Sequence, residues 1–289
     1  MTLSTLGAAR KIAPTIGAEE APTERALVIP QGASIPDPRM WKPELLHRLR
    51  TPVNKLKINW KNKLAKNLKF FGVVVPGGLY DIVGRKFYNL PNATIRTYPT
   101  LGLVAEYNGT TQDILTIPDI IIDNGDARSM TVAGCFYRVG NGVTNLAPVA
   151  FFSKDYAATY HLGFRYGFDH YHVACIGRGS SNATYNTQQS GPSVFGVPIV
   201  CSGTFLNSYN INEAQTLGYA NRVLSDPDVE ALYGGSFTNI NRLGMSGYPL
   251  GPSERGECGI RFMALWDDKW DAVQHITFQN DPYQFLVPA

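Results

Sequence analysis

The spacing of hydrophobic residues along the chain predicts β-strands. From Tyr160 to Tyr166, aromatic and aliphatic residues alternate with histidine, glycine and arginine, which is typical of a strand with one buried face. The run 259–266, GIRFMALW, is apolar at both sets of alternating positions, so we expect a strand that is covered on both sides. The core residues that alternation places on one face of this strand are Ile260, Phe262 and Trp266, together with Ala264.

Turn signals separate the apolar runs. Run 70–75 ends at Pro76-Gly77-Gly78, and run 129–142 ends at Gly140-Asn141-Gly142. Many short apolar runs with turns between them predict an all-β fold, a two-sheet antiparallel sandwich. A short helix is expected after Asp267, and a second one at 225–235, where Ser225 is a candidate N-cap.

Composition excludes several other classes of protein. Only 17% of the 289 residues are charged, against roughly 25% in ordinary globular chains. Together with 28 glycines and 19 prolines, this value excludes a helical bundle. No stretch approaches the ~18 consecutive apolar residues of a membrane helix, so no membrane partner is expected. Residues 1–20 lack a continuous apolar region, so we expect synthesis in a cytoplasm.

The N-terminal part differs from the rest in composition. Residues 1–46 contain six prolines between small and polar residues, and they show no sustained hydrophobic period. Such a segment cannot bury enough apolar surface to fold alone. We therefore expect two parts: an extended N-terminal arm with a basic linker over 1–56, and a sandwich domain over 57–289.

Positive charge is concentrated after this arm. Residues 45–86 hold ten Lys or Arg and one acid, Asp81. Nucleic-acid binding would need aromatic side chains between the basic ones, and Trp60 is the only aromatic in the basic segment 48–69. We therefore expect no nucleic-acid partner and interpret the segment as protein-docking, with an acidic partner surface facing it. The attachment residues of this interpretation are Arg48, Arg50, Lys55 and Lys57.

The sequence shows no motif for catalysis. GxSxG, Walker and HExxH motifs are absent, and a glycoside hydrolase on this fold would need two carboxylates on one strand face. The dense groups of acids lie instead where helices are expected to begin, where acids favour the helix dipole. These groups are Asp226, Asp228 and Glu230, and Asp267, Asp268 and Asp271. We therefore expect no catalytic residues and no enzymatic activity.

Two sets of residues are candidate metal ligands. His170 and His172 would share one face of a strand, and Asp119, Asp123 and Asp126 supply the hard oxygens that calcium prefers. The alternatives are imidazoles that form hydrogen bonds near a sheet edge, and an Asp/Asn-Gly turn that bonds its own backbone. The histidine pair lacks a further ligand downstream. We expect no cofactor, with calcium as the candidate ion.

Aromatic residues gather between 156 and 171. Sugar binding needs exposed aromatic rings beside planar amide or carboxylate groups, whereas most Phe and Tyr side chains of a large sandwich belong to its core. The aromatic residues of this cluster are Tyr156, Tyr160, Tyr166, Phe168 and Tyr171.

The order of these segments resembles a known family. Segment 57–90 contains an Ile-Asn-Trp element and an Asp-x-x-Gly turn, and segment 256–289 ends in an Asn-x-Pro-aromatic-Gln-aromatic tail. With 102–119 and 241–247, these segments resemble the laminin-G-like, concanavalin-A-like jelly-roll proteins of tailed bacteriophages. The resemblance covers about 57–289, and segment 216–225 departs from the family pattern.

The resemblance implies a fold and a role. The fold is a concanavalin-A-like jelly roll with an extended N-terminal arm and a short C-terminal helix. The role is that of a structural virion protein, made in the bacterial cytoplasm, that decorates or cements the head or forms a head fibre. Its partners would be capsid or tail subunits and further copies of itself, held through the arm. The alternative is a carbohydrate-binding adhesion module for a surface glycan, and a glycoside hydrolase is the disfavoured third.

Overall fold

The structure of the protein is a computed structural model. It describes residues 56–98, 102–121, 128–139, 149–152, 161–166, 173–178, 184–188, 198–207, 215–220, 223–224, 239–247 and 257–288. The expected arm lies outside these residues except for Leu56, and the helix expected at 225–235 lies outside them as well.

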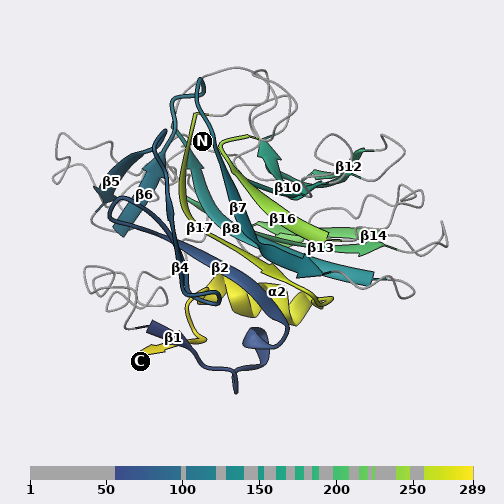
Figure 1. The fold of residues 1–289 in the computed structure, drawn as a ribbon. Coiled ribbons are helices and arrows are strands. Elements are labelled where there is room, and N and C mark those ends of the chain that lie inside the picture. The colour runs from purple at the N-terminus through teal and green to yellow at the C-terminus, as the bar shows by residue number, and fades with distance from the viewer. Residues whose placement is uncertain are drawn as a thin grey trace, which may run out of the picture.

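Two antiparallel sheets form a sandwich (Figure 1). In spatial order, the smaller sheet consists of β12 (Thr184–Gln188), β11 (Val173–Arg178), β10 (His161–Tyr166), β9 (Val149–Phe152), β16 (Asn239–Met245) and β7 (Asp113–Ile121). The larger sheet runs through β15 (Val223–Leu224), β14 (Gln215–Ala220), β13 (Ile199–Asn207), β8 (Arg128–Arg138), β17 (Cys258–Trp266), β2 (Leu68–Val75), β3 (Gly78–Asp81) and β4 (Lys86–Asn89). The prediction of an all-β, two-sheet antiparallel sandwich is confirmed.

Short elements complete the described part of the chain. They are β1 (Leu56–Ile58), η3 (Lys63–Ala65, a 3-10 helix), β5 (Thr94–Tyr98), β6 (Gly102–Glu106), α2 (Ala272–Asn280) and β18 (Leu286–Pro288). In the part of the chain that the structure describes, no helix has the length and apolar character needed to cross a membrane.

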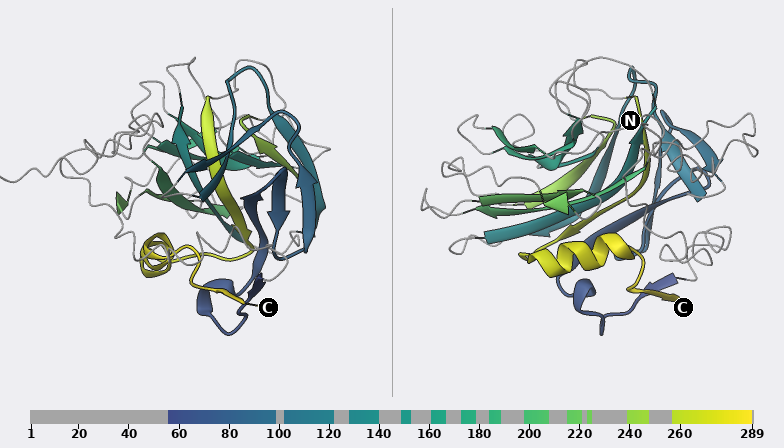
Figure 2. Two further views of the ribbon diagram at one scale, coloured as in Figure 1. Left: turned by 90° about the vertical axis from the view of Figure 1, so that its left-hand side faces the viewer. Right: turned by 180° about the vertical axis from the view of Figure 1, so that it is seen from behind.

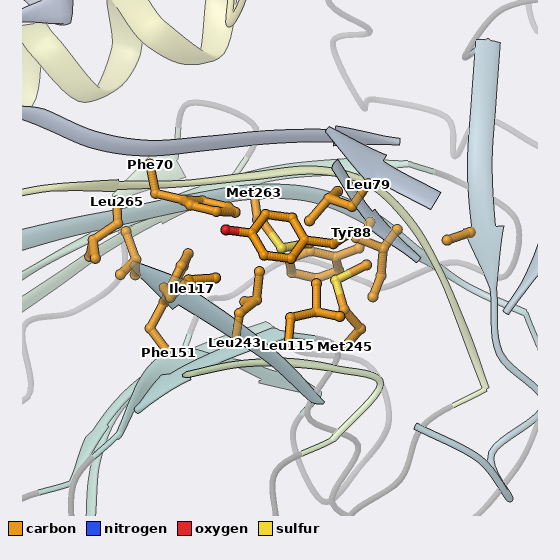
Figure 3. Packing of buried hydrophobic residues seen from close by; sticks show 14 of the residues in the cluster. Phe70, Leu79, Tyr88, Leu115, Ile117, Phe151, Leu243, Met245, Met263 and Leu265 are labelled. Carbon is orange, nitrogen blue, oxygen red and sulfur yellow. The ribbon is translucent and has the colours of Figure 1, made fainter. Parts of the chain in front are cut away.

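The inner face of the larger sheet closes the sandwich. Its side chains interdigitate with those of the smaller sheet in one buried cluster (Figure 3). The cluster residues labelled there are Phe70, Leu79, Tyr88, Leu115, Ile117, Phe151, Leu243, Met245, Met263 and Leu265. Since each large apolar side chain contributes about 1.5–3 kcal/mol when it leaves water, this cluster accounts for the pairing of the two sheets.

The outer face of the larger sheet carries a second cluster, which helix α2 and the C-terminal tail cover (Figure 2). We call it the outer aromatic cluster, and its rings belong to Phe71, Phe262, Trp266, Trp270, Phe278, Tyr283 and Phe285. The ring centroids of Trp266 and Trp270 lie 4.3 Å apart, and those of Trp266 and Phe278 lie 5.3 Å apart. Edge-to-face and tilted pairs of this kind add to the energy of burial.

Strand β17 lies between these two clusters, as its apolar character on both faces predicted. Ile260, Phe262 and Trp266 are all fully buried. The prediction that Ile260 shares a face with the other two is wrong, because Ile260 belongs to the inner cluster and Phe262 and Trp266 to the outer one. A β-bulge between Ile260 and Phe262 inserts Arg261 and reverses the alternation.

The bulge marks a point where the larger sheet branches. Beyond β17, residues Phe262–Trp266 pair with β2, whereas Gly259 and Ile260 pair with β6, which in turn pairs with β5. The buried Arg261 guanidinium lies between the branches, and its Nη1 donates to the carbonyls of Val74 (3.1 Å) and Leu103 (3.0 Å). Arg261 thereby binds carbonyl groups of both branches.

Helix α2 begins at a capping box. Asp271 Oδ1 accepts from the backbone N–H of Gln274 (2.8 Å), and Gln274 Oε1 accepts from the backbone N–H of Asp271 (3.0 Å). Behind the helix, His275 contacts the hydroxyls of Ser202 (2.8 Å, at Nδ1) and Thr204 (3.0 Å, at Nε2) on β13. Burial lowers the pKa of His275 to about 3, so the imidazole is neutral at physiological pH.

Candidate binding surface

The two ends of the described chain meet beside the outer aromatic cluster. Strands β1 and β18 pair over three residues, and they lie together at the bottom of Figure 1. The backbone N–H of Asn59 then donates to the carbonyl of Phe285 (2.7 Å). The Ile-Asn-Trp element and the aromatic tail, which carry the family resemblance, are therefore parts of one structural unit.

A tight turn follows β1, and we call residues 59–62 the Trp60 turn. The backbone N–H of Asn62 donates to the carbonyl of Asn59 (2.9 Å), and the side chain of Asn59 accepts from the N–H of Lys61 (3.2 Å). Asn62 caps η3 by accepting from the N–H of Leu64 (2.9 Å). With both ends and the middle hydrogen-bonded, the turn has a defined backbone shape.

Trp60 projects from this turn, and 58% of its surface is exposed. The framework below it is buried: Leu64 and Ala65 of η3 belong to the outer aromatic cluster, and Trp266 Nε1 donates to the carbonyl of Leu64 (2.7 Å). Because most of the indole is in water, it adds little to the core, and its ring is available for contact with a ligand.

The residues next to Trp60 in the sequence are polar. Asn59 and Asn62 supply planar amides, and Asn62 Nδ2 also lies 3.5 Å from the carbonyl of Gln284 in the tail. Lys57 of β1 and Lys61 of the turn are exposed. Both asparagine side chains form hydrogen bonds within this unit, so the exposed ring of Trp60 is the group that remains available to a sugar.

A different constellation lies on the outer face of the branch that β5 and β6 form. The buried carboxylate of Glu106 accepts hydrogen bonds from the hydroxyls of Tyr98 and Tyr137 (2.5 Å for Tyr137), and Arg96 Nε lies 2.7 Å from its second oxygen. Burial and the hydrogen bond to Glu106 raise the pKa of both tyrosines, so the hydroxyls stay protonated and donate. Gly259 is required here, since a Cβ would overlap the Tyr137 ring.

Two more acids are buried in the described residues, and their burial was not predicted from the sequence. Asp113 accepts from Tyr107 (2.9 Å) and from Asn92 (2.9 Å). Asp81 accepts from the backbone N–H groups of Val83 and Gly84 in its Asp-x-x-Gly turn (3.0 Å each), and burial raises its pKa to about 6. Asp113 is the first residue of β7 and Asp81 the last residue of β3, so each acid lies at the end of a strand and resembles a turn residue in the sequence.

The sequence-predicted site residues are distributed as follows. Lys57 is exposed on β1, whereas Arg48, Arg50 and Lys55 lie outside the described residues. Asp119 is exposed on β7, and its candidate calcium partners Asp123 and Asp126 lie outside, as do His170 and His172. Among the residues that the structure describes, no group of three or more His, Cys, Asp or Glu side chains is placed to hold a metal ion.

Of the two groups of acids expected at the beginning of helices, the structure describes one. Asp271 is the N-cap of α2, Asp267 lies 3.7 Å from Lys69, and Asp268 accepts from Asn67 (3.3 Å). Asp226, Asp228 and Glu230 lie outside the described residues, as do Tyr156, Tyr160, Phe168 and Tyr171 of the aromatic cluster, and only the backbone of Tyr166 is described.

Comparisons with known proteins support the fold. The sequence matches no protein-family model and no curated protein. Domain 4 of AbnA, a GH43 extracellular arabinanase of Geobacillus stearothermophilus solved with arabinotriose, is similar in structure: TM-score 0.54, 12% identity, 74% of this chain and 98% of that one. The binding domain of Paraclostridial Mosquitocidal Protein 1 gives a TM-score of 0.52 at 9% identity, over 75% of this chain and 52% of that one.

A third similar structure is the Trypanosoma rangeli sialidase, with a TM-score of 0.50 and 14% identity over 86% of this chain. The match spans 38% of the sialidase, so it concerns a part of that protein. At these identities the comparisons establish the sandwich fold that the resemblance implied, and they carry no information on a phage origin.

The comparisons correct the expectation that the chain is not an enzyme. Structures of this fold belong to a sialidase and to a GH43 arabinanase, so the fold does not exclude enzymatic activity. The expectation also relied on an absence of acids from strands, and it overlooked Glu106 and Asp113, which lie on β6 and β7.

Proposed function

We propose that this protein is a carbohydrate-binding module and that the Trp60 turn is its contact surface. The observation that carries the proposal is the exposed indole, which is held on a turn whose backbone and capping side chains are hydrogen-bonded. A turn whose backbone is already ordered loses little conformational freedom when a sugar stacks on its exposed ring. The complex of AbnA domain 4 with arabinotriose supports the proposal at the level of the fold.

Trp60→Ala tests this proposal in a glycan-array screen followed by calorimetry on the best ligand. We expect the variant to lose about tenfold or more in affinity, as is usual when a central aromatic contact is truncated. Phe87→Ala is the matched control, because Phe87 is a similarly exposed aromatic on β4 (51%). Full affinity of Trp60→Ala, or an equal loss in both variants, would contradict the proposal.

A second candidate function is the structural virion role that the family resemblance implies. The observation in its favour is the exposed Lys57 at the end of the basic segment, which could pair with an acidic subunit together with Arg48, Arg50 and Lys55. Because β1 begins at Leu56, a chain without residues 1–55 keeps every contact described above. We expect this shortened chain to remain folded but not to bind to virus particles that lack the full-length protein. Binding at full occupancy would contradict the structural role.

A further inference from the structure

We propose that the ligand of the Trp60 turn is an anionic glycan, whose carboxylate or sulfate groups contact lysines that flank the indole. This inference rests on the proposed function and specifies its ligand class. β1, the turn, η3 and the residues up to Lys69 form one unit that carries several charges.

The charges of this unit all have one sign. Residues 56–69 contain five lysines and no acid. Lys69 lies 3.7 Å from Asp267. The other four have no ion pair with any residue that the structure describes, and all four are exposed; they are Lys57, Lys61, Lys63 and Lys66.

The buried side chains of the unit determine how these lysines are presented. Leu56 and Ile58 face the core, so Lys57 between them faces solvent. In η3, Leu64 and Ala65 are buried, and Lys63 and Lys66 on either side of them are exposed. Lys61 follows Trp60 directly, at a Cα distance of about 3.8 Å. The four exposed lysines therefore flank Trp60 along a segment whose backbone is anchored to the tail.

Like charges gathered in one short segment repel one another, and a bound anion relieves that repulsion. A single exposed ion pair between a lysine and a ligand anion is weak, so a high affinity requires several such pairs along one ligand. A chain of acidic sugars supplies both a ring face for Trp60 and repeated charges for the lysines. Single-stranded nucleic acid fits less well, because stacking of successive bases uses several aromatics and Trp60 is the only one in 56–69.

Two matched pairs of probes test the inference on the full chain: oligogalacturonate with its methyl ester, and dextran sulfate with dextran. We expect the acidic member of at least one pair to bind about tenfold tighter than its neutral partner in 50 mM salt. That advantage should disappear in 300 mM salt, where exposed charges are screened. Replacing all four lysines by glutamine should reduce affinity to the neutral level, and Trp60→Ala should weaken binding of both members.

The control is the double variant Lys86→Gln and Lys269→Gln, which removes exposed lysines outside the unit and should leave affinity unchanged. If both members of a pair bind equally and depend on Trp60, the anionic class is wrong and the proposed function stands. If no saccharide binding depends on Trp60, the proposed function fails and this inference with it. Binding of polyglutamate or oligo(dT) as tightly as the acidic glycans, through the same residues, would overturn the assignment to glycans.

Discussion

Trp266 and Trp60 both lie next to the short helix η3, but their environments are opposite: one is buried and the other exposed. Trp266 is fully buried, packs against Trp270 and Phe278, and donates its indole N–H to the carbonyl of Leu64. Trp60 lies only four residues before Leu64 and is mostly exposed. The outer aromatic cluster thus stabilises the framework, and the Trp60 turn uses that framework to present a side chain to solvent.

The two regions also differ in the kind of bond that shapes them. In the outer aromatic cluster, the fold depends on burial and ring packing, which are strong and have little directionality. In the turn, the shape depends on hydrogen bonds between the backbone and two asparagines, each with a net contribution of about 1 kcal/mol. Substitutions in the cluster should therefore change stability, whereas substitutions in the turn should mainly change binding.

The largest effect is expected from Trp266→Ala. It would leave a cavity against Trp270 and Phe278 and free the carbonyl of Leu64, so the free energy of unfolding should fall by about 3–5 kcal/mol in urea titrations. Val273→Ala on the exposed side of α2 is the control and should cost less than about 0.5 kcal/mol. A loss below about 1 kcal/mol for Trp266→Ala would show that the cluster does not stabilise the framework.

The next effect concerns acid, through His275 beneath α2. Its pKa is about 3 in the folded protein and 6.5 in the unfolded chain, so the unfolded state binds the proton more tightly between these values. The contribution of His275 to the free energy of unfolding should therefore be fully present above pH 6.5 and should be lost as the pH falls toward 3. Asp81 acts in the opposite direction between pH 3.8 and about 6, because its folded-state pKa is raised.

The comparison of wild type with His275→Gln separates the two groups, since Asp81 is present in both. The pH-dependent loss should be smaller in the variant when melting temperatures are measured from pH 7 to pH 4. Equal slopes in the two proteins would mean that His275 already gains a proton in the folded state.

The fold was largely predictable from the sequence, with one instructive exception. Alternation and turn residues are local signals, and they predicted the sandwich and the double burial of β17. The bulge at Arg261 was not predictable, because it arises in the pairing of β17 with β8, and pairing between distant segments leaves no local signal in the sequence. That single inserted residue moved Ile260 to the opposite face.

The candidate site was harder to predict. The sequence identified Trp60 only as an interruption of a basic run, since its exposure depends on β1 pairing with β18 more than 200 residues away. Glu106 shows the reverse case: an acid at the end of an apolar strand, followed by a tyrosine, resembles a solvent-facing residue. Its burial follows from Tyr98 and Tyr137, which come from two other strands.

A smaller effect on stability is expected from Asn62→Ala, which removes the cap of η3 and the side-chain contact with Gln284. The cost should be about 0.5–1 kcal/mol, near the lower end for a lost N-cap because η3 is short. Glycan affinity should also fall although Trp60 is retained, as calorimetry can measure. Asn62→Ser restores a capping oxygen but not the contact with Gln284, so it should recover most of the loss in both quantities. A failure to recover any of it would show that the cap does not shape the turn.

The smallest effect on stability is expected from the residue with the largest expected effect on binding. Trp60→Ala removes an indole that is mostly in water, so the free energy of unfolding should change by less than about 0.5 kcal/mol. The hydrogen bonds of the turn involve the backbone and the asparagines, and none of them uses the indole. Thermal melts of this variant and of Trp266→Ala, measured side by side, therefore give the sharpest contrast between the two regions. If Trp60→Ala instead cost more than about 1 kcal/mol, a drop of roughly 2–4 °C in melting temperature for a chain of this size, the indole would be part of the framework. The contact surface would then have to be sought elsewhere on the sandwich.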